Sequence, residues 1–367
     1  MTQRNSPAVF TLLSLALLAP TGLTSAVAAP AESADYAGAA ARVAARDAQL
    51  PRSERRRARN VILFVGDGMG ISTLTAARIL EGQRRGESGE DNRLSFEEFP
   101  HTALVKTFSA NQQTSDSAPT ATAMVTGHRA NDGTLSVAPV VADSEPDQAK
   151  VQAASLVTVL EQARARGMAT GLVTTTRITH ATPAANYAHT ANRDWEHNGQ
   201  LPQGATVPDI AAQLVAQQRT AGGLHVVMGG GREMLLPRGT TDPEYPQLQG
   251  RRTDGRNLVD EWLAAQPASR YVWNRTQFDA LDPRQKGPVL ALFEPSHLRY
   301  ETDRAADPAG EPSLAEMTRK ALQLLQASGK GYYLMVEGGR IDHAHHAGNA
   351  YRALTDAIAL SDAVRVA

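Results

Sequence analysis

The chain has 367 residues, with 37 lysines and arginines against 38 aspartates and glutamates, a formal net charge of −1 and no cysteine. This length allows one large domain or two average ones. The balanced charge gives no reason to expect a nucleic-acid partner, and the lack of cysteine excludes disulfides, thiolate metal sites and cysteine nucleophiles.

Residues 1–29 have the layout of a secretory signal peptide. Arg4 supplies the positive start, residues 9–18 form a short apolar run, and Ala26-Val27-Ala28 is a small-residue cleavage site. The apolar run is too short to span a bilayer. We therefore expect no membrane span and an exported protein, periplasmic or extracellular; the alternative is that this run is a buried helix of the domain.

Residues 30–59 are rich first in alanine and then in arginine. A basic run is usually a solvated segment, so we expect a flexible arm here, followed by a domain that occupies residues 60–367.

Strand-like apolar runs and helical periodicity alternate along this domain. Strands are expected at residues 61–65, 102–108, 169–175, 224–228, 289–293 and 332–337, and helices at residues 71–83, 118–126, 156–166, 207–218, 313–327 and 351–366. Such alternation indicates an α/β layered fold with a largely parallel sheet, in which ligands bind beyond the carboxyl ends of the strands. Residues 229–288 are rich in Gly, Pro, Arg and Asp and are expected to form loops.

The stretch VGDGMG places Asp67 directly after the first expected strand, between two glycines. Glycines let a backbone turn sharply and approach a ligand closely, so a dinucleotide-binding loop is one interpretation. A carboxylate in the loop would repel a pyrophosphate, and a metal ligand explains Asp67 better. The structural alternative is an aspartate in an ordinary turn.

Ser117 lies in the stretch TSDSAPTATAMVTG, where Ser-Asp-Ser can cap a helix and Pro119 fits the first turn. Gly127 can close the helix. Ser117 is thus expected at a helix N-terminus, where free N–H groups and the helix dipole favour an anion. Its hydroxyl is either a nucleophile toward phosphate or an ordinary capping group.

A third polar stretch, TTRITHATP followed by YAHTANRDW, comes after the strand expected at residues 169–175. His180 and Thr182 are two residues apart, so they face the same ligand if the segment is extended. Arg193 carries a planar guanidinium that suits phosphate. The alternative for each is an ordinary loop residue.

The strongest signal is MVEGGRIDHAHHAG, residues 335–348. Asp342 and His346 are four apart and share one face if the segment is helical. A carboxylate oxygen together with an imidazole nitrogen suits zinc, whereas Glu337, at the end of the last expected strand, suits a harder cation such as magnesium. The alternative is a solvated histidine-rich turn.

In this order, the four motifs resemble the alkaline phosphatase family, from about residue 60 to the end of the chain. The resemblance implies a mixed, largely parallel sheet sandwiched between helices, two Zn²⁺ sites, one Mg²⁺ site and a homodimer. It implies hydrolysis of phosphate monoesters, with Ser117 as the nucleophile that becomes phosphoserine and Arg193 holding the phosphate. The metal ligands that it implies are Asp67 between the second zinc and the magnesium, Thr182 and Glu337 at the magnesium with His180 beside them, and Asp342 and His346 at the first zinc.

The chain also departs from the family pattern. His180 stands where many bacterial members have aspartate, although animal members have histidine there, and His343 stands where some members have lysine. The family's later Asp-His pair and a further histidine, which complete the two zinc sites, do not occur before Ala367. We therefore expect an incomplete domain without its final strands, two ligands at each zinc, and weak or absent activity.

Three alternatives compete with this interpretation. A sulfatase-like nucleophile needs an arginine where Ala121 stands. A dinucleotide oxidoreductase would depend on the glycine loop alone, and Asp67 argues against it. A metal- or phosphate-binding pseudoenzyme is favoured by the missing zinc ligands.

Overall fold

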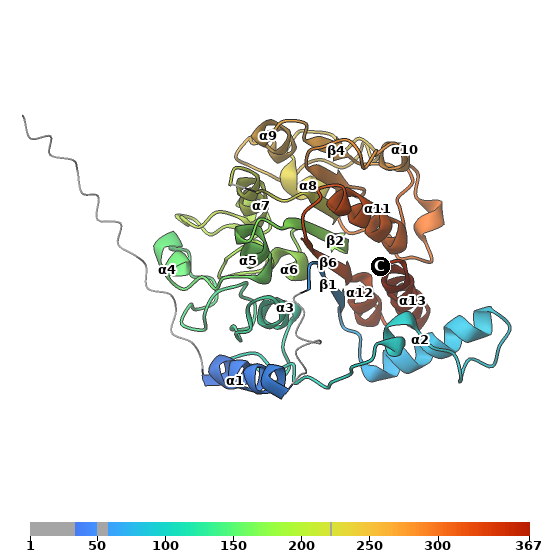
Figure 1. Cartoon of the computed structure of the whole chain (residues 1–367). Helices are drawn as coiled ribbons and strands as arrows, with labels where there is room; N and C mark the ends of the chain where they lie inside the picture. Colours follow the sequence, from blue (N-terminus) through green and yellow to red (C-terminus); the bar gives the residue numbers. More distant parts are fainter. Residues whose placement is uncertain (1–33, 50–57, 221) are drawn as a thin grey trace, which may run out of the picture.

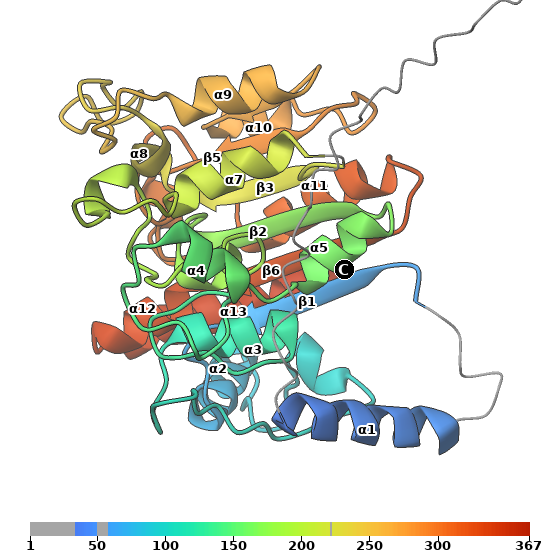
Figure 2. The same cartoon turned by 90° about the vertical axis from the view of Figure 1, so that its left-hand side faces the viewer.

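The structure, a computed structural model, describes residues 34–49, 58–220 and 222–367. Six strands form one sheet in the order β1-β6-β2-β3-β5-β4, and every pairing is parallel (Figure 2). The strands are β1 (Val61–Gly66), β2 (Ala169–Arg177), β3 (Val226–Gly230), β4 (Arg270–Val272), β5 (Val289–Leu292) and β6 (Tyr332–Gly338). The predicted signal peptide, residues 1–29, lies outside the described residues.

Helices connect the strands and cover both faces of the sheet (Figure 1). They are α1 (Ala34–Gln49), α2 (Ile71–Arg84), α3 (Ser117–Thr126), α4 (Gln148–Ala153), α5 (Val159–Ala165), α6 (Ala181–Ala184), α7 (Ile210–Gln218), α8 (Arg232–Leu235), α9 (Leu258–Ala265), α10 (Arg275–Asp279), α11 (Leu314–Gln326), α12 (Arg340–His346) and α13 (Ala350–Val366). Short 3-10 helices occupy Ser95–Glu98, Asn198–Gln200 and Arg304–Ala306. Among the described helices, none combines the length and apolar character that crossing a membrane requires.

The sheet separates two apolar cores because neighbouring strand residues point to opposite faces. In β2, Leu172 packs into the core formed with α3, α5, α6, α7 and α9, whereas Val173 packs into the core formed with α11 and α13. All strand side chains of β3, β5 and β6 are buried, as expected for a parallel sheet covered on both sides. The predicted α/β fold, with a parallel sheet between helices, is therefore confirmed.

The capped helices confirm specific sequence signals. Ser313 and Glu316 form the predicted capping box at the start of α11. Gly127 ends α3 in the left-handed conformation, with φ of 78°, which glycine adopts without steric cost.

Three sequence expectations differ from the structure. Residues 102–108 form no strand: Leu104 is 88% exposed and Val105 is 81% exposed, so the apolar run has no sheet neighbour and no core to enter. Residues 229–288 are not only loops, because they contain α8, α9, α10 and β4. The expected arm contains helix α1, whose Tyr36 ring stacks on His128 with centroids 4.3 Å apart; the mobility of the arm stays a prediction.

Candidate active site

Ser117 is the first residue of α3, as the capping pattern predicts. The carboxylate of Asp116 caps the helix by accepting the Ala118 N–H. Its second oxygen accepts the Gly133 N–H at 2.6 Å, so the turn before Ser117 is held from two sides. The Ser117 side chain therefore stands at a helix N-terminus, half-buried, where the helix dipole favours negative charge.

Arg193 connects Ser117 to the rest of the site. One guanidinium nitrogen, NH1, donates to Ser117 Oγ at 3.0 Å and to Asp116 Oδ1 at 2.9 Å. The other, NH2, lies 3.0 Å from His180 Nε2. The structure thus brings together three residues that are far apart in the sequence: Ser117, His180 and Arg193.

The carboxylates of Asp67 and Glu337 meet at the carboxyl ends of neighbouring strands. Strand β1 pairs with β6 so that Val65 is opposite Glu337. Glu337 is fully buried, and its Oε2 accepts the hydroxyls of Thr174 and Thr176. Burial, with the nearby charges of Glu337 and Asp342, raises the pKa of Asp67 to about 8.

A cation fits between these carboxylates. Among the described residues, Asp67 Oδ2 and Glu337 Oε1 are buried atoms without a hydrogen-bond partner. Buried like charges without partners are costly unless a positive charge joins them. Burial raises the pKa of Glu337, and the hydroxyls around it, that of the buried Thr182 among them, act in the opposite direction.

Asp342 and His346 lie on α12, which confirms the predicted helical spacing. Asp342 Oδ2 is 3.4 Å from His346 Nε2, and His346 is 80% exposed. The backbone beside Asp67 comes close to this helix: a Cβ added to Gly68, which has φ of 62°, would lie 2.5 Å from Asp342 Oδ1. Glycine is therefore required where the loop after β1 passes Asp342.

The tautomer of His180 follows from its partner. Because arginine only donates, Nε2 of His180 accepts from Arg193, and the ring proton of neutral His180 lies on Nδ1. Burial and the charge of Arg193 lower the pKa of His180 well below its ordinary value. In this arrangement neither nitrogen offers a lone pair to a cation, so metal ligation by His180, which stays a prediction, would require Arg193 to release Nε2.

Two groups of residues were missed by sequence reasoning. His297 lies beside His180 and His343, with ring centroids 5.3 Å and 4.3 Å away. It follows β5 and belongs to no motif, and no sequence signal was available to find it.

The second missed group is a carboxylate cluster formed by Glu244, Glu294 and Asp307, whose ligand atoms all lie within 4.8 Å of one another. Arg299 Nε lies 3.3 Å from Glu294 and 3.2 Å from Asp307. Burial and the charge of Glu244 raise the pKa of Glu294 to about 8. This group could hold a metal ion, and it shares no residue with the Ser117 site.

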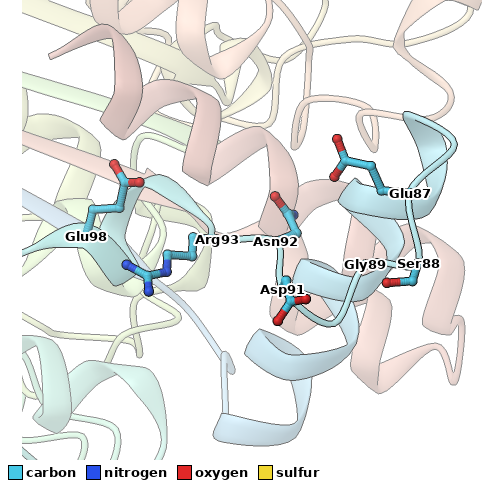
Figure 3. Close-up of a pocket in the computed structure, with 7 residues that line it drawn as sticks. All are labelled: Glu87, Ser88, Gly89, Asp91, Asn92, Arg93 and Glu98. Carbon is cyan, nitrogen blue, oxygen red and sulfur yellow. The ribbon is translucent and has the colours of Figure 1, made fainter.

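A cavity of about 520 Å³ also lies elsewhere. Figure 3 shows its lining, which consists of residues from the loop after α2 and of Glu98, the last residue of the following 3-10 helix. The loop residues are Glu87, Ser88, Gly89, Asp91, Asn92 and Arg93. None of these residues belongs to the four motifs, so this cavity is not part of the candidate site.

Known proteins resemble the chain over the whole α/β domain. The family model for alkaline phosphatase matches residues 58–367. The chain is 46% identical over 319 residues to the tissue-nonspecific alkaline phosphatase of Gallus gallus and 44% identical over 316 residues to that of Homo sapiens. Each match covers 84% of this chain, and the chain spans 60% and 59% of the length of these relatives.

Solved structures of alkaline phosphatases have a similar fold. The alkaline phosphatase of Thermus thermophilus has a TM-score of 0.67 and 28% identity, with 86% of this chain and 59% of that chain covered. A cold-active alkaline phosphatase from Shewanella sp. has a TM-score of 0.63 and 25% identity, with 84% and 63% covered. The sequence match, the parallel sheet and the residues gathered at its strand ends lead to one conclusion: the chain belongs to the alkaline phosphatase family.

Proposed function

We propose that this chain hydrolyses phosphate monoesters through a phosphoserine formed on Ser117. The observation that carries the proposal is the contact of Arg193 NH1 with Ser117 Oγ at 3.0 Å, at the N-terminus of α3. A hydroxyl held beside a guanidinium and a helix N-terminus is placed to attack phosphorus while both groups stabilise the anionic oxygens.

Two displacements then complete the reaction. In the first, Ser117 Oγ loses its proton, bonds to phosphorus and displaces the alcohol, which leaves with a proton. In the second, water attacks the same phosphorus, so that inorganic phosphate leaves and the Ser117 hydroxyl is restored. Arg193 binds the transferred group in both steps.

The unpartnered carboxylate oxygens support a metal requirement. Asp67, Thr182 and Glu337 would hold Mg²⁺, with Asp67 shared by a Zn²⁺ beside Ser117, and Asp342 with His346 would hold a second Zn²⁺. When bound, these ions would polarise the reacting oxygens and neutralise the clustered charge. One solved neighbour, a variant of the alkaline phosphatase from the Antarctic bacterium TAB5, holds Mg.

Export of the protein and a homodimer are part of the same proposal. The layout of residues 1–29 supports export to the periplasm or the extracellular space. The homodimer follows from the family resemblance and is tested by the mass of the purified protein in solution.

The test is an assay of p-nitrophenyl phosphate at alkaline pH with zinc and magnesium supplied. We expect turnover that falls by about 10³-fold or more in Ser117→Ala, because the nucleophile is removed. Ser115→Ala is the matched control: its hydroxyl donates only to the Asp116 carbonyl, at 3.0 Å, and the variant should keep its turnover.

Intact-protein mass spectrometry after an acid quench adds a second readout. A phosphoryl group should appear on the parent chain and be absent from Ser117→Ala. Turnover that persists in Ser117→Ala would overturn the serine mechanism. Phosphate binding without any turnover would instead support the pseudoenzyme alternative.

A further inference from the structure

His297 lies in the loop after β5, and backbone contacts fix that loop to the ends of two other strands. The Leu298 N–H donates to the Thr175 carbonyl at 3.1 Å, and the Gly231 N–H donates to the Glu294 carbonyl at 3.0 Å. A Cβ added to Gly230 would lie 2.0 Å from the Ser296 carbonyl oxygen, so only glycine allows this approach. The position of His297 is therefore set by β2 and β3, not by β5 alone.

Arg177, the last residue of β2, holds the His297 ring. Its backbone N–H lies 3.1 Å from Nδ1 and its guanidinium NH1 lies 2.6 Å from Nε2. Because a neutral imidazole has one acceptor nitrogen, one of these two contacts is a hydrogen bond and the other is packing against the ring. Glu196, which is 4% exposed, fixes that guanidinium with both carboxylate oxygens, one of them at 2.8 Å from Arg177 Nε. The ion pair of the partly exposed Arg177 with the buried Glu196 thus holds the guanidinium against the His297 ring.

On its other side, His297 packs against both imidazoles of the Ser117 site. Its ring meets His343 at 4.3 Å with planes 68° apart, and His180 at 5.3 Å with planes 80° apart. His180 and His343 are themselves 5.4 Å apart at 83°. The three rings therefore contact one another edge-to-face, and His180 in turn touches Arg193.

Two simpler roles explain His297 less well. The three imidazoles are not arranged as a metal site, because both ring nitrogens of His297 face N–H groups of Arg177 and Nε2 of His180 faces Arg193. His297 is not a core filler either, because it is partly exposed and touches two polar rings instead of one of the apolar cores.

We propose that His297 is a positioning residue for phosphate binding: anchored by Arg177, it supports the rings of His343 and His180 and, through His180, the guanidinium of Arg193. This inference rests on the proposed function of the Ser117 site. A phosphate that binds Arg193 needs both guanidinium nitrogens in a fixed direction. Without the His297 ring, His180 and His343 gain room to move, and Arg193 loses part of its orientation.

The experiment measures phosphate binding separately from turnover. Calorimetric titration of the zinc- and magnesium-supplied protein with inorganic phosphate gives Kd, and the p-nitrophenyl phosphate assay gives kcat and KM. We expect His297→Ala to raise the phosphate Kd and KM together by about 10-fold, the effect of one hydrogen bond to a charged group, and to change kcat by less than about 3-fold.

His225→Ala is the matched control. His225 Nδ1 also accepts a backbone N–H from β2, that of Thr170 at 3.3 Å, but at the opposite end of the strand. The control loses the same type of bond and should keep the phosphate Kd of the parent chain. If His297→Ala fails to fold, His297→Asn, which retains an acceptor for the Arg177 N–H, takes its place in every comparison.

A double-mutant cycle tests whether His297 acts through its neighbours. In a His343→Ala background, the effect of His297→Ala on Kd should shrink from about 10-fold to less than about 3-fold, because one of the supported rings is gone. Three outcomes would each overturn the proposal. They are an unchanged phosphate Kd in His297→Ala, the same fold-change in Kd in the parent and His343→Ala backgrounds, and an equally weakened phosphate affinity in His225→Ala.

The same titration distinguishes this proposal from the proposed function. If the chain binds phosphate with the expected pattern but shows no turnover, the phosphoserine mechanism fails and the role of His297 stands. If turnover depends on Ser117 but the phosphate Kd is the same in His297→Ala and the parent chain, the mechanism stands and the role of His297 fails.

Discussion

Buried charges occur in two contrasting settings in this molecule. Arg252, which is 1% exposed, donates to both oxygens of Asp209 at 2.9 Å and 3.0 Å and to Asp254 at 3.1 Å. Every charge in that network is opposed by another. Asp67 and Glu337, in contrast, are two carboxylates at neighbouring strand ends, each with a buried oxygen that lacks a partner.

The difference suggests two roles for buried charges. The ion pairs of Arg252 stabilise the fold, whereas Asp67 and Glu337 are the carboxylates for which a metal ligand is proposed. A matched buried pair is costly to break but does no chemistry. An unmatched buried carboxylate destabilises the protein alone and becomes favourable when a cation binds. The two settings should therefore respond in opposite ways to the same kind of substitution.

The largest effect is expected at the matched network. Arg252→Ala leaves Asp209 buried without its counter-charge, so the free energy of unfolding should fall by about 3–5 kcal/mol. Urea denaturation measures it. Arg284→Ala is the control: it removes an ion pair with Asp282 from a side chain that is 90% exposed, and should cost less than about 1 kcal/mol. Equal losses in both variants would contradict the comparison.

At the unpartnered carboxylates, removing a charge should instead increase the free energy of unfolding. Asp67→Asn removes a carboxylate whose pKa is raised from 3.8 to about 8. The raised pKa means that folding is penalised as the pH rises above 3.8, and fully so above about 8. In metal-free protein at neutral pH, the variant should therefore be more stable by on the order of 2 kcal/mol.

Bound metal should reverse the order of stability of the parent chain and Asp67→Asn. With zinc and magnesium present, the parent chain gains binding energy that Asp67→Asn largely loses, so the parent should become the more stable of the two. Thermal unfolding with and without a chelator measures both signs. An asparagine variant that is less stable than the parent without metal would show that Asp67 is not an unmatched charge.

A third, smaller effect concerns His189, a partly exposed histidine with acceptors on both sides. Its Nδ1 lies 2.8 Å from the Ser136 carbonyl and its Nε2 lies 3.1 Å from Glu161 Oε1, so both nitrogens donate when the ring is protonated. Burial opposes protonation, but the hydrogen bond and charge of Glu161 prevail and raise the pKa of His189.

This stabilisation is complete below the ordinary histidine pKa and is lost as the pH rises through the raised pKa of the folded protein. The gap in unfolding free energy between the parent and His189→Gln should be roughly 1–2 kcal/mol near about pH 6 and narrow toward about pH 9. His225→Gln is the control, because burial lowers the pKa of His225. A gap that widens with rising pH would contradict the assignment.

The smallest effect on folding should come from the exposed apolar segment. Leu104→Lys changes a side chain that is 88% exposed, so the unfolding free energy should move by less than about 0.5 kcal/mol. The charge should still reduce self-association, since unpaired, strand-prone segments recruit other chains. Sedimentation velocity measures this, and unchanged association would show that residues 102–108 do not drive it.

Sequence periodicity predicted most of the fold. The expected strands at residues 61–65, 169–175, 224–228, 289–293 and 332–337 all correspond to strands in the sheet, with ends shifted by up to two residues. The failure at residues 102–108 has a physical cause: strand propensity describes a residue's fit to a half-buried sheet, and no neighbouring strand is present there.

The site was predictable where its residues lie close together in sequence. The spacing of Asp342 and His346, and the place of Ser117 at a helix start, required only local geometry. His297 and Glu196 were not predictable, because they join the site only through Arg177 at the end of β2. No local sequence pattern shows which distant residues lie beside that strand end.

The position of β6 in the sheet sets the order in which the protein can assemble. Strands β2, β3, β5 and β4 neighbour one another, but β1 pairs only with β6, and residue 61 is opposite residue 333. During synthesis, β1 therefore stays without its β6 partner until residue 333 has emerged from the ribosome. Such high contact order slows folding and lengthens exposure to aggregation. Asp67 follows β1 and Glu337 lies on β6, so these two carboxylates meet only after that late pairing has formed.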